Sequence, residues 1–419
     1  MKVLHLNHSD FNGGAAKASY RLHTSLRRIG VESTMLVKHK ELLDSTTLEA
    51  SYFANTGFLR IVDKYSWKVK NYLNKRKWKR YPHKQNVFMN DLGSISLKKA
   101  LATIDFDILH LHWITLQFLD INELVKINKP IVWTLHDSWP FTGGCHFFYK
   151  CENYKSKCGN CQFLNSNSEY DLTREIWHRK KEVYKQCKIF VVSPSNWLAE
   201  CAKASSLFNS FPITVIPNGI NTDTFQPKMN NSFKEFISYN ASTKYILFGA
   251  VNSTSDKNKG YHLLIEAINS LKSKTTIEIE LIVFGSDSIN DSNLRDFQTH
   301  YLGKLSNEHV LADAYNLADV VVVPSMSENL SNVIMETLSC GKPVVAFDIG
   351  GNSDMIKHLE NGLLVPPFST EQFAEAILWA LNVNVDKHLN IKARKTAVEN
   401  YSENIIAESY LDLYKRILN

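Results

Sequence analysis

One stretch, residues 320 to 362, constrains the fold of this chain more than any other. Val320 to Val323 is a wholly apolar, β-branched run, which is typical of a central strand in a parallel sheet. The spacing of apolar residues from Asn332 to Ser339 predicts a helix, and Gly341 supplies its C-terminal stop. A second apolar run, Pro343 to Phe347, follows at once. A strand, a helix and another strand in this order predict an α/β fold.

Two glutamates lie near the start of this predicted helix, and they differ in what they could touch. Glu328 precedes the helix, whereas Glu336 lies inside it. The backbone N–H groups of about Leu330 to Val333, which include those of Ser331 and Asn332, would point out of the helix start, where the dipole favours an anion such as a diphosphate. Glu328 would lie beside that anion, and Glu336 would be set back along the helix, each able to hold hydroxyls. An anion with a polyol on each side describes a nucleotide-diphosphate sugar.

This spacing, with CGKPVVAFDIGGNSDMI after it, resembles the donor-site signature of the family 4 retaining glycosyltransferases. The resemblance implies the GT-B fold: an α/β architecture of two Rossmann-like domains whose parallel sheets face each other across a cleft. It also implies that Glu328 contacts the donor sugar, that Glu336 holds the ribose, and that Gly350 and Gly351 lie on the loop under the sugar. Two surface glutamates flanking an amphipathic helix are the alternative, and the strand, CGKP and GG context argues against it.

The length of 419 residues is enough for two domains with separate cores. We expect an N-terminal, acceptor-side domain at residues 1–217, on which a C-terminal helix at 402–419 packs, and a nucleotide-sugar-binding domain at 218–401. The run VIPNGINTDTFQP, with a turn at its Asn-Gly pair and two prolines, marks the crossing. No apolar run approaches the roughly 18 residues of a spanning helix, and the first one is too short for a signal peptide. A cytoplasmic protein is expected.

Two glycines form a second candidate loop near the N-terminus. Residues 1–12 predict a strand and a polar loop, Gly13 and Gly14 follow, and Ala15 to Arg28 predicts a helix. Glycines at this position let the backbone come close to a ligand, although a simple tight turn is the alternative. The run GGAAKASYRLHTSL resembles the first loop of the family, which implies that Gly13 and Gly14 lie between the acceptor and the donor phosphate.

Histidines follow two further predicted strands. His136 comes directly after Ile131 to Leu135, and His112 with Trp113 ends the run DILHLHW. Ligands of open parallel sheets gather at the carboxyl ends of strands, so these side chains are cleft candidates, with plain packing as the alternative. The run TLHDSWPFTGGCH resembles the family, which implies that His136 reaches the donor sugar and the reacting centre.

A lysine precedes another predicted helix. Lys259 lies at the helix start, where a cation opposes the dipole unless an anion binds there, so it is a candidate for the donor phosphates. The family usually has an Arg between the preceding strand and this Lys, but residues 251–256 contain none and Lys257 is the only spare cation. The resemblance also implies that the loop around Lys304 and Leu305 meets the base through backbone atoms, and it leaves UDP and GDP types open.

Four of the seven cysteines fall close together, at Cys145, Cys151, Cys158 and Cys161. The CGNC segment is a two-residue knuckle that offers two thiolates to one zinc ion, and four thiolates complete a tetrahedral structural site. A disulfide pairing is disfavoured in a reducing cytosol, and plain packing is the other alternative. Such a zinc ion would brace a loop, and no catalytic metal is expected from the resemblance. The insertion resembles a subgroup of the family associated with exopolysaccharide assembly.

Residues 64 to 84 carry nine Lys or Arg and no Asp or Glu, so the basic character of the chain, whose net charge is +6, is local. The aromatic residues among them are Tyr65, Trp67, Tyr72, Trp78 and Tyr81. This composition suits an anionic membrane surface. A solvated basic helix face is the alternative, and nucleic acid, which would need a similar surface, is not the expected partner.

Together these motifs predict a transferase that moves a sugar from a nucleotide-diphosphate sugar to a glycan, and the family resemblance implies that it is retaining and metal-independent. The acceptor is expected to be a lipid-linked intermediate of bacterial surface polysaccharide synthesis, met by a cytoplasmic protein peripheral on the inner membrane face. Two alternatives stay open: a GT-B sugar-nucleotide epimerase or phosphorylase, and a non-catalytic nucleotide-sugar-binding scaffold, which the missing Arg favours. The sugar, the base, the linkage and the oligomeric state are undefined by the sequence.

Overall fold

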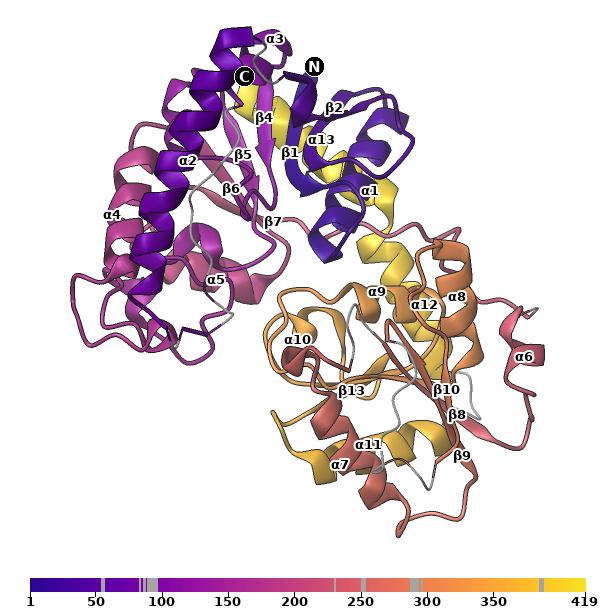
Figure 1. Cartoon of the computed structure of the whole chain (residues 1–419). Helices are drawn as coiled ribbons and strands as arrows, with labels where there is room; N and C mark the ends of the chain where they lie inside the picture. Colours follow the sequence, from indigo (N-terminus) through magenta and orange to yellow (C-terminus); the bar gives the residue numbers. More distant parts are fainter. Residues whose placement is uncertain are drawn as a thin grey trace. The chain divides into compact units, whose positions relative to one another are not determined.

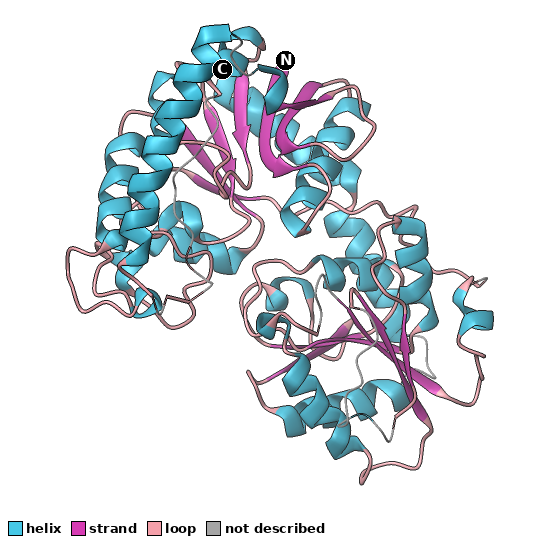
Figure 2. Cartoon of the chain, in the orientation of Figure 1, coloured by secondary structure: helices cyan, strands magenta, loops and turns pink. Residues whose placement is uncertain are grey.

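The chain divides into two compact units, each of which is an α/β unit with one parallel sheet. The computed structural model describes residues 1–53, 57–82, 84–85, 88, 97–229, 231–249, 254–286, 294, 297–383 and 388–419. Unit 1 comprises Met1–Ile216 and Ile406–Asn419, and unit 2 comprises Pro217–Ile405. The division lies next to the boundary expected after residue 217. Figure 1 shows the order of the elements, and Figure 2 shows the two sets of strands in magenta.

The sheet of unit 1 has seven strands in the order β3-β2-β1-β4-β5-β6-β7. All neighbouring strands are parallel. The chain builds outward from β1 to β3 and then returns to the other side of β1, so the switch point lies between β1 and β4. The strands are β1 (Lys2–Ser9), β2 (Glu32–His39), β3 (Thr47–Glu49), β4 (Ile108–Leu111), β5 (Ile131–Thr134), β6 (Ile189–Ser193) and β7 (Ile213–Val215).

Helices cover both faces of this sheet. One face packs against α1 and α13 through a cluster that includes Val3, Ile108 and Tyr414. The opposite face packs on an aromatic-rich core that includes Trp133 and Tyr184. The helices are α1 (Gly14–Arg28), α2 (Gly57–Lys79), α3 (Lys98–Thr103), α4 (Leu172–Tyr184), α5 (Asn196–Ala204) and α13 (Glu403–Leu418). The last helix of the chain therefore completes the N-terminal unit (Figure 1).

The sheet of unit 2 has six parallel strands in the order β10-β9-β8-β11-β12-β13, with the switch point between β8 and β11. The strands are β8 (Lys244–Gly249), β9 (Ile279–Phe284), β10 (Thr299–Tyr301), β11 (Val320–Val323), β12 (Val344–Phe347) and β13 (Gly362–Val365). The helices are α6 (Phe233–Phe236), α7 (Tyr261–Leu271), α8 (Glu308–Leu317), α9 (Asn332–Ser339), α10 (Asn352–Met355), α11 (Thr370–Val383) and α12 (His388–Tyr401).

β11 shows why its sequence is apolar at every position. Val320 and Val322 face the cluster formed with α7 and α11, whereas Val321 and Val323 face the cluster formed with α8, α9 and α12. Because helices cover both faces, no residue of the strand meets solvent. The strand and α9 have the bounds predicted from the sequence. Among the described helices of the chain, none has the length and apolarity needed to cross a membrane.

Candidate functional site

The loops that follow β8 and β11 bring two of the predicted site residues together. These strands are neighbours at the switch point of the unit 2 sheet, and open α/β sheets bind ligands at the carboxyl ends of strands there. Lys259 ends a 3₁₀ turn before α7, and Glu328 lies between β11 and α9. Lys259 Nζ donates to Glu328 Oε1 at 2.8 Å. A cation and a carboxylate therefore meet at the edge of the sheet where a ligand is expected.

This ion pair is partly shielded from solvent. The Lys259 side chain is 25% exposed and that of Glu328 is 15% exposed. Ser325 Oγ donates to the same Glu328 oxygen at 3.0 Å. Burial by itself lowers the pKa of Lys259, but the Glu328 carboxylate outweighs this effect, so the pKa is raised. Lys259 is therefore positively charged at neutral pH.

Two glycines allow the loops around the pair to touch through their backbones. Gly260 has φ +73°, and a Cβ there would lie 1.9 Å from the carbonyl oxygen of Pro324. Gly350 has φ +54°, and a Cβ there would lie 1.8 Å from the carbonyl oxygen of Glu328. Gly351 N donates to that same oxygen at 3.3 Å. The glycine pair expected under the donor sugar thus supports the backbone of Glu328, and Gly260 is a site residue that the sequence did not reveal.

Asn258 ties the two loops together, and sequence reasoning missed this residue as well. Its side-chain Nδ2 donates to Ser327 O at 2.9 Å, and its backbone carbonyl oxygen accepts from Met326 N at 2.8 Å. The side chain is 7% exposed. These bonds fix the loop after β11 directly before Glu328. Asn258 lies between Lys257 and Lys259 in the run DKNKG, which is the part of the loop that lacks the usual Arg. That departure from the family pattern is the only signal in the sequence that points to this residue.

The start of α9 follows Glu328 closely. Leu330 and Ser331 are buried, and Asn332 begins the helix. The Ser331 side chain makes no capping hydrogen bond within the described part of the chain, while its carbonyl oxygen accepts from Met335 N at 3.2 Å. The helix therefore starts without the side-chain cap that is usual at an N-terminus. Such an end suits an anion.

Glu336 lies deeper than the sequence suggested. It is 2% exposed, and its Oε2 accepts from the Tyr315 hydroxyl of α8 at 2.8 Å. Lys304 and Leu305 lie in the loop after β10, with Lys304 exposed and Leu305 packed on the core of unit 2. The roles of these three residues stay predictions.

In unit 1, Gly13 lies at the carboxyl end of β1, on the switch point with β4. Its φ is +98°, and a Cβ there would meet nothing within 4 Å. The backbone conformation, and not crowding, therefore favours glycine here. Gly14 begins α1, one residue before the predicted helix start. The loop is thus open on the side where a side chain would project.

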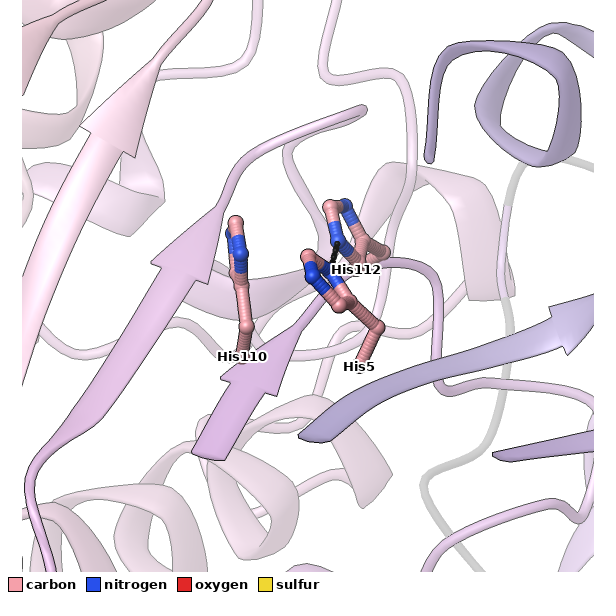
Figure 3. A group of neighbouring side chains, drawn as sticks. All are labelled: His5, His110 and His112. Atoms are coloured by element: carbon pink, nitrogen blue, oxygen red, sulfur yellow. Dashed lines mark hydrogen bonds between the residues drawn. The ribbon is translucent and has the colours of Figure 1, made fainter. Parts of the chain in front are cut away.

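A chain of three imidazoles leads from His136 into the core of unit 1. His136 Nε2 lies 3.1 Å from His112 Nδ1, and His112 Nε2 lies 3.0 Å from His5 Nδ1. His5 Nε2, at the inner end, is buried and has no hydrogen-bond partner among the described residues. Figure 3 shows His5 on β1 beside His110 and His112 from the neighbouring β4 segment. Sequence reasoning named His112 and His136 but missed the other two.

Burial keeps these rings neutral. Desolvation lowers the pKa of His136 to about 4 and lowers the pKa values of His112 and His5 well below the usual histidine range. A neutral imidazole has one N–H and one acceptor nitrogen. Each bond in the chain needs one donor and one acceptor, so the three rings must all donate in the same direction. The tautomer of His136 is therefore coupled to that of His5.

His5, His110 and His112 also place ligand atoms within 4.8 Å of one another, which no other group of three potential metal ligands does among the described residues. However, His110 Nδ1 lies 2.7 Å from the Tyr414 hydroxyl, and His110 Nε2 lies 2.8 Å from Thr134 Oγ1. Both nitrogens of His112 are also taken, as described above. The cluster is therefore a buried hydrogen-bond network and not a metal site.

The predicted zinc ligands lie in the loop region between β5 and α4. Cys145, Cys151, Cys158 and Cys161 all line one small cavity. No disulfide joins any of the seven cysteines, all of which are within the described residues.

The basic segment, residues 64–84, forms most of α2. Residue 83 lies outside the described residues, and so do the side chains of Lys64, Trp67 and Lys70. Its exposed side chains include Tyr65, Lys68, Val69, Tyr72, Leu73, Lys75, Arg76, Lys79 and Arg80. Trp78, in contrast, packs with its ring centroid 5.2 Å from that of Phe88, and the Tyr81 hydroxyl accepts from Leu172 N at 3.1 Å. Trp78 and Tyr81 therefore also pack within unit 1, and membrane binding by this segment stays a prediction.

Comparisons with known proteins agree with this architecture. Residues 12–224 match the model of Glycosyltransferase Family 4, and residues 244–382 match that of Glycosyl transferases group 1. An uncharacterised glycosyltransferase of Methanocaldococcus jannaschii is 27% identical over 354 residues, which are 80% of this chain and 82% of that protein. WcaC of Escherichia coli, a putative colanic acid biosynthesis glycosyl transferase by name, is 27% identical over 58% of this chain and 59% of its own length.

Solved structures are similar over the whole chain. Sucrose-phosphate synthase of Thermosynechococcus elongatus has a TM-score of 0.68 at 18% identity and covers 100% of this chain and 99% of its own. HepE of Anabaena, solved with UDP and glucose, has a TM-score of 0.65 at 15% identity and covers 99% and 100%. Such identities bear on the fold alone. Because the family model matches half of the chain and both sheets are those of a GT-B protein, this chain belongs to glycosyltransferase family 4.

Proposed function

We propose that this glycosyltransferase takes its sugar from a nucleotide-diphosphate sugar of the UDP or GDP type, retains the anomeric configuration and needs no catalytic metal. One observation carries the proposal: Lys259 and Glu328 pair at 2.8 Å at the switch point of the unit 2 sheet. A lysine suits the diphosphate, and a carboxylate beside it suits sugar hydroxyls. Both residues lie on loops at carboxyl strand ends, where open α/β sheets bind nucleotides.

In this mechanism the donor separates the pair. Lys259 passes from the carboxylate to the phosphate oxygens, and Glu328 then accepts hydrogen bonds from sugar hydroxyls. As the C1–O bond breaks, its electron pair goes to the leaving phosphate oxygen, whose charge Lys259 and the N–H groups at Asn332 stabilise. The acceptor oxygen bonds to C1 on the same face of the sugar, and its proton goes to a phosphate oxygen.

The other predicted site residues keep the roles that the family resemblance implies. Glu336 holds the ribose, and the backbone at Lys304 and Leu305 contacts the base. For unit 1, the resemblance implies that the Gly13–Gly14 loop serves the donor phosphate and that His136 serves the reacting sugar. His136 acts as a neutral hydrogen-bonding group, because burial lowers its pKa to about 4.

The loop between β8 and α7 contains two lysines, where the family usually has an arginine and a lysine. Residues 250–260 contain Lys257 and Lys259 and no Arg. Lys257 is exposed in the turn that Lys259 ends. We propose that Lys257 takes part of the phosphate charge, which would reduce the need for the Arg that the family usually has.

The names of similar proteins support the donor class. HepE was solved with UDP and glucose, and the pneumococcal O-GlcNAc transferase GtfA, with a TM-score of 0.65 at 12% identity, was solved with UDP and GlcNAc. WcaC is named for colanic acid biosynthesis. The name of WcaC supports a glycan acceptor in the synthesis of a bacterial surface polysaccharide. We propose that this acceptor is lipid-linked.

We propose the anionic inner membrane face as the place where that acceptor is met. On α2, Tyr65, Val69 and Tyr72 are exposed near cationic side chains. Exposed apolar groups beside cations suit the headgroup region of an anionic bilayer. This membrane proposal holds whether the donor carries uridine or guanosine.

The first test is thermal stabilisation of the full chain by UDP, GDP and ADP. A ligand at a hundredfold excess over its Kd stabilises the folded state by about 2.7 kcal/mol. Selective stabilisation by UDP or GDP, lost in Lys259→Met, supports the donor site, and no response to any nucleotide contradicts it. Lys274→Met is the matched control, because Lys274 pairs with Glu371 and Glu375 at the surface of the same unit.

A second assay separates the alternatives. Donor turnover only with membrane extract is expected of the proposed transferase. Turnover of the nucleotide sugar without any acceptor would instead indicate an epimerase, and binding without turnover would indicate a scaffold.

A further inference from the structure

The cavity lined by four cysteines in unit 1 has the chemistry of a metal site. Its walls also include glycines and aromatic residues: Gly143, Phe148, Tyr154, Gly159 and Phe163. The remaining cysteines of the chain, at positions 187, 201 and 340, do not line it. Four thiols that come from separate turns of one loop region therefore border the same cavity, whereas a packing role would need only small apolar side chains.

The CGNC knuckle has an unusual backbone. Cys158, Gly159 and Asn160 have φ values of +24°, +118° and +46°, so three consecutive residues lie in the left-handed region. Residues other than glycine rarely adopt this conformation, which costs free energy and is often found at ligand clamps. The result is that Cys158 and Cys161 both line the same cavity.

Neighbouring segments hold the knuckle in this shape. Gly159 N donates to Thr173 Oγ1 at 2.9 Å, and Cys161 N donates to Asp171 Oδ2 at 2.8 Å. A Cβ on Gly159 would lie 2.3 Å from the carbonyl oxygen of Glu169. The start of α4 thus braces the knuckle against the rest of unit 1.

One of the sulfur atoms already accepts a hydrogen bond from the backbone, since Gly143 N donates to Cys158 Sγ at 3.2 Å. N–H donors of this kind stabilise a thiolate more than a thiol, because hydrogen bonds to a charged acceptor are the stronger ones.

The described residues that line the cavity include no cationic side chain. The nearby buried Lys180 donates to the carbonyl oxygens of Trp139 and Thr142 and is not among them. The cavity therefore offers four sulfur atoms to a bound cation and, among these lining residues, no charged group that competes with it.

We propose that Cys145, Cys151, Cys158 and Cys161 bind one zinc ion in a closed, tetrahedral site. Four thiols lose their protons to solvent as the four Zn–S bonds form, and no ligand position is left for substrate. Zn–S bonds of about 2.3 Å in a tetrahedron place the sulfurs roughly 3.8 Å apart. Within the described residues, no three of the sulfurs lie within 4.8 Å of one another. Zinc binding therefore draws the four cysteine-bearing turns of this loop region toward one another.

The test measures the metal content of the full chain, purified under reducing conditions, by mass spectrometry of the elements. We expect about one zinc per chain and negligible iron. The paired variant Cys158→Ser/Cys161→Ser should lose the zinc, whereas Cys187→Ser/Cys201→Ser should keep it, since these two cysteines lie outside the cavity.

A second measurement covers the case in which the first variant does not fold. The wild-type chain is stripped of metal with a chelator and titrated with Co²⁺, for which we expect the absorption of a tetrahedral thiolate complex that Zn²⁺ then displaces. Three results would each overturn the proposal. The first is a chain that contains no zinc and does not bind Co²⁺, and the second is a chain that contains iron and absorbs visible light. The third is fewer than seven titratable thiols after denaturation. None of these readouts depends on the donor or on transfer activity.

Discussion

Lys259 Nζ and Glu328 Oε1, 69 residues apart in the sequence, lie 2.8 Å apart at the carboxyl ends of two neighbouring strands. The pair gives the lysine a counter-charge, since the Glu328 carboxylate raises its pKa against the effect of burial. A diphosphate that replaces this carboxylate releases Glu328 for the sugar. The two halves of the proposed donor are therefore coupled through one ion pair.

This coupling predicts opposite effects for two substitutions. Lys259→Met should weaken UDP or GDP binding by tenfold or more, about 1.4 kcal/mol, because it removes the cation. Glu328→Gln should leave nucleotide binding equal or tighter, since Lys259 loses its competitor, while sugar transfer falls by at least about a hundredfold. Calorimetry and a transfer assay measure the two effects. Equal losses of nucleotide affinity in both variants would contradict the proposed division of roles.

The ion pair also shows what the sequence could and could not reveal. The bounds of β11 and α9 were predictable, because a run of four valines and a helical spacing are local signals. The contact between Lys259 and Glu328 was not, because it depends on β8 lying beside β11, which follows from the crossover of the whole chain. Glu336 was expected to face a ligand, and its burial beside Tyr315 depends in the same way on where α8 packs.

The buried histidines were hidden for a different reason. His5 and His110 lie two residues along their strands from Val3 and Ile108, and therefore on the same face, which α1 and α13 cover. A strand buried on both faces shows no alternation from which the direction of a polar side chain could be read. His110 has two hydrogen-bond partners: Thr134, which lies on β5, and Tyr414, which lies on the last helix of the chain.

The glycines beside the ion pair give the second prediction. Gly350→Ala should destabilise the loop, because a Cβ would lie 1.8 Å from Glu328 O at a φ of +54°. We expect a loss of roughly 2 kcal/mol or a local rearrangement, with nucleotide stabilisation abolished. Gly30→Ala is the control, since Gly30 also has a positive φ but its Cβ would meet nothing within 4 Å. The hypothesis fails if both variants keep the full thermal shift with nucleotide.

The neutral histidines predict an acid-sensitive unit 1. In the unfolded chain a histidine takes up its proton near pH 6.5, whereas folded His136 does so near pH 4. Between these values the unfolded state binds more protons, so stability falls as the pH drops, by up to about 1.4 kcal/mol per pH unit for each such histidine. Chemical denaturation at several pH values should show a shallower slope for His112→Gln than for wild type. An unchanged slope would contradict the buried-neutral assignment, and His309→Gln, at an exposed position, is the control.

The chain of imidazoles makes His5 a positioning residue for His136. His5→Leu removes the partner of His112 Nε2, so the N–H of His136 is no longer held on one ring nitrogen. We expect kcat to fall by about tenfold with little change in the KM for the donor, and ¹⁵N NMR to show mixed His136 tautomers. His5→Asn, whose amide can replace Nδ1, should restore a single tautomer and most of the rate. A parallel loss in both variants would indicate a structural role only.

The exposed face of α2 gives the last prediction. Lys75, Arg76, Lys79 and Arg80 are exposed, while Lys77 pairs with Glu175, so replacing the first four with Gln removes charge without breaking that pair. Each cation near an anionic surface contributes about 1 kcal/mol, so binding to phosphatidylglycerol vesicles should weaken by a hundredfold or more in a co-sedimentation assay. The matched control replaces four exposed, glutamate-paired lysines elsewhere, Lys155, Lys185, Lys203 and Lys395. Equal weakening in both variants would show that net charge, and not this helix, sets membrane binding. If the α2 variant binds the vesicles as tightly as the wild type, the membrane hypothesis is contradicted. The basic residues of α2 and the exposed Tyr65 and Tyr72 would then form a solvated helix face.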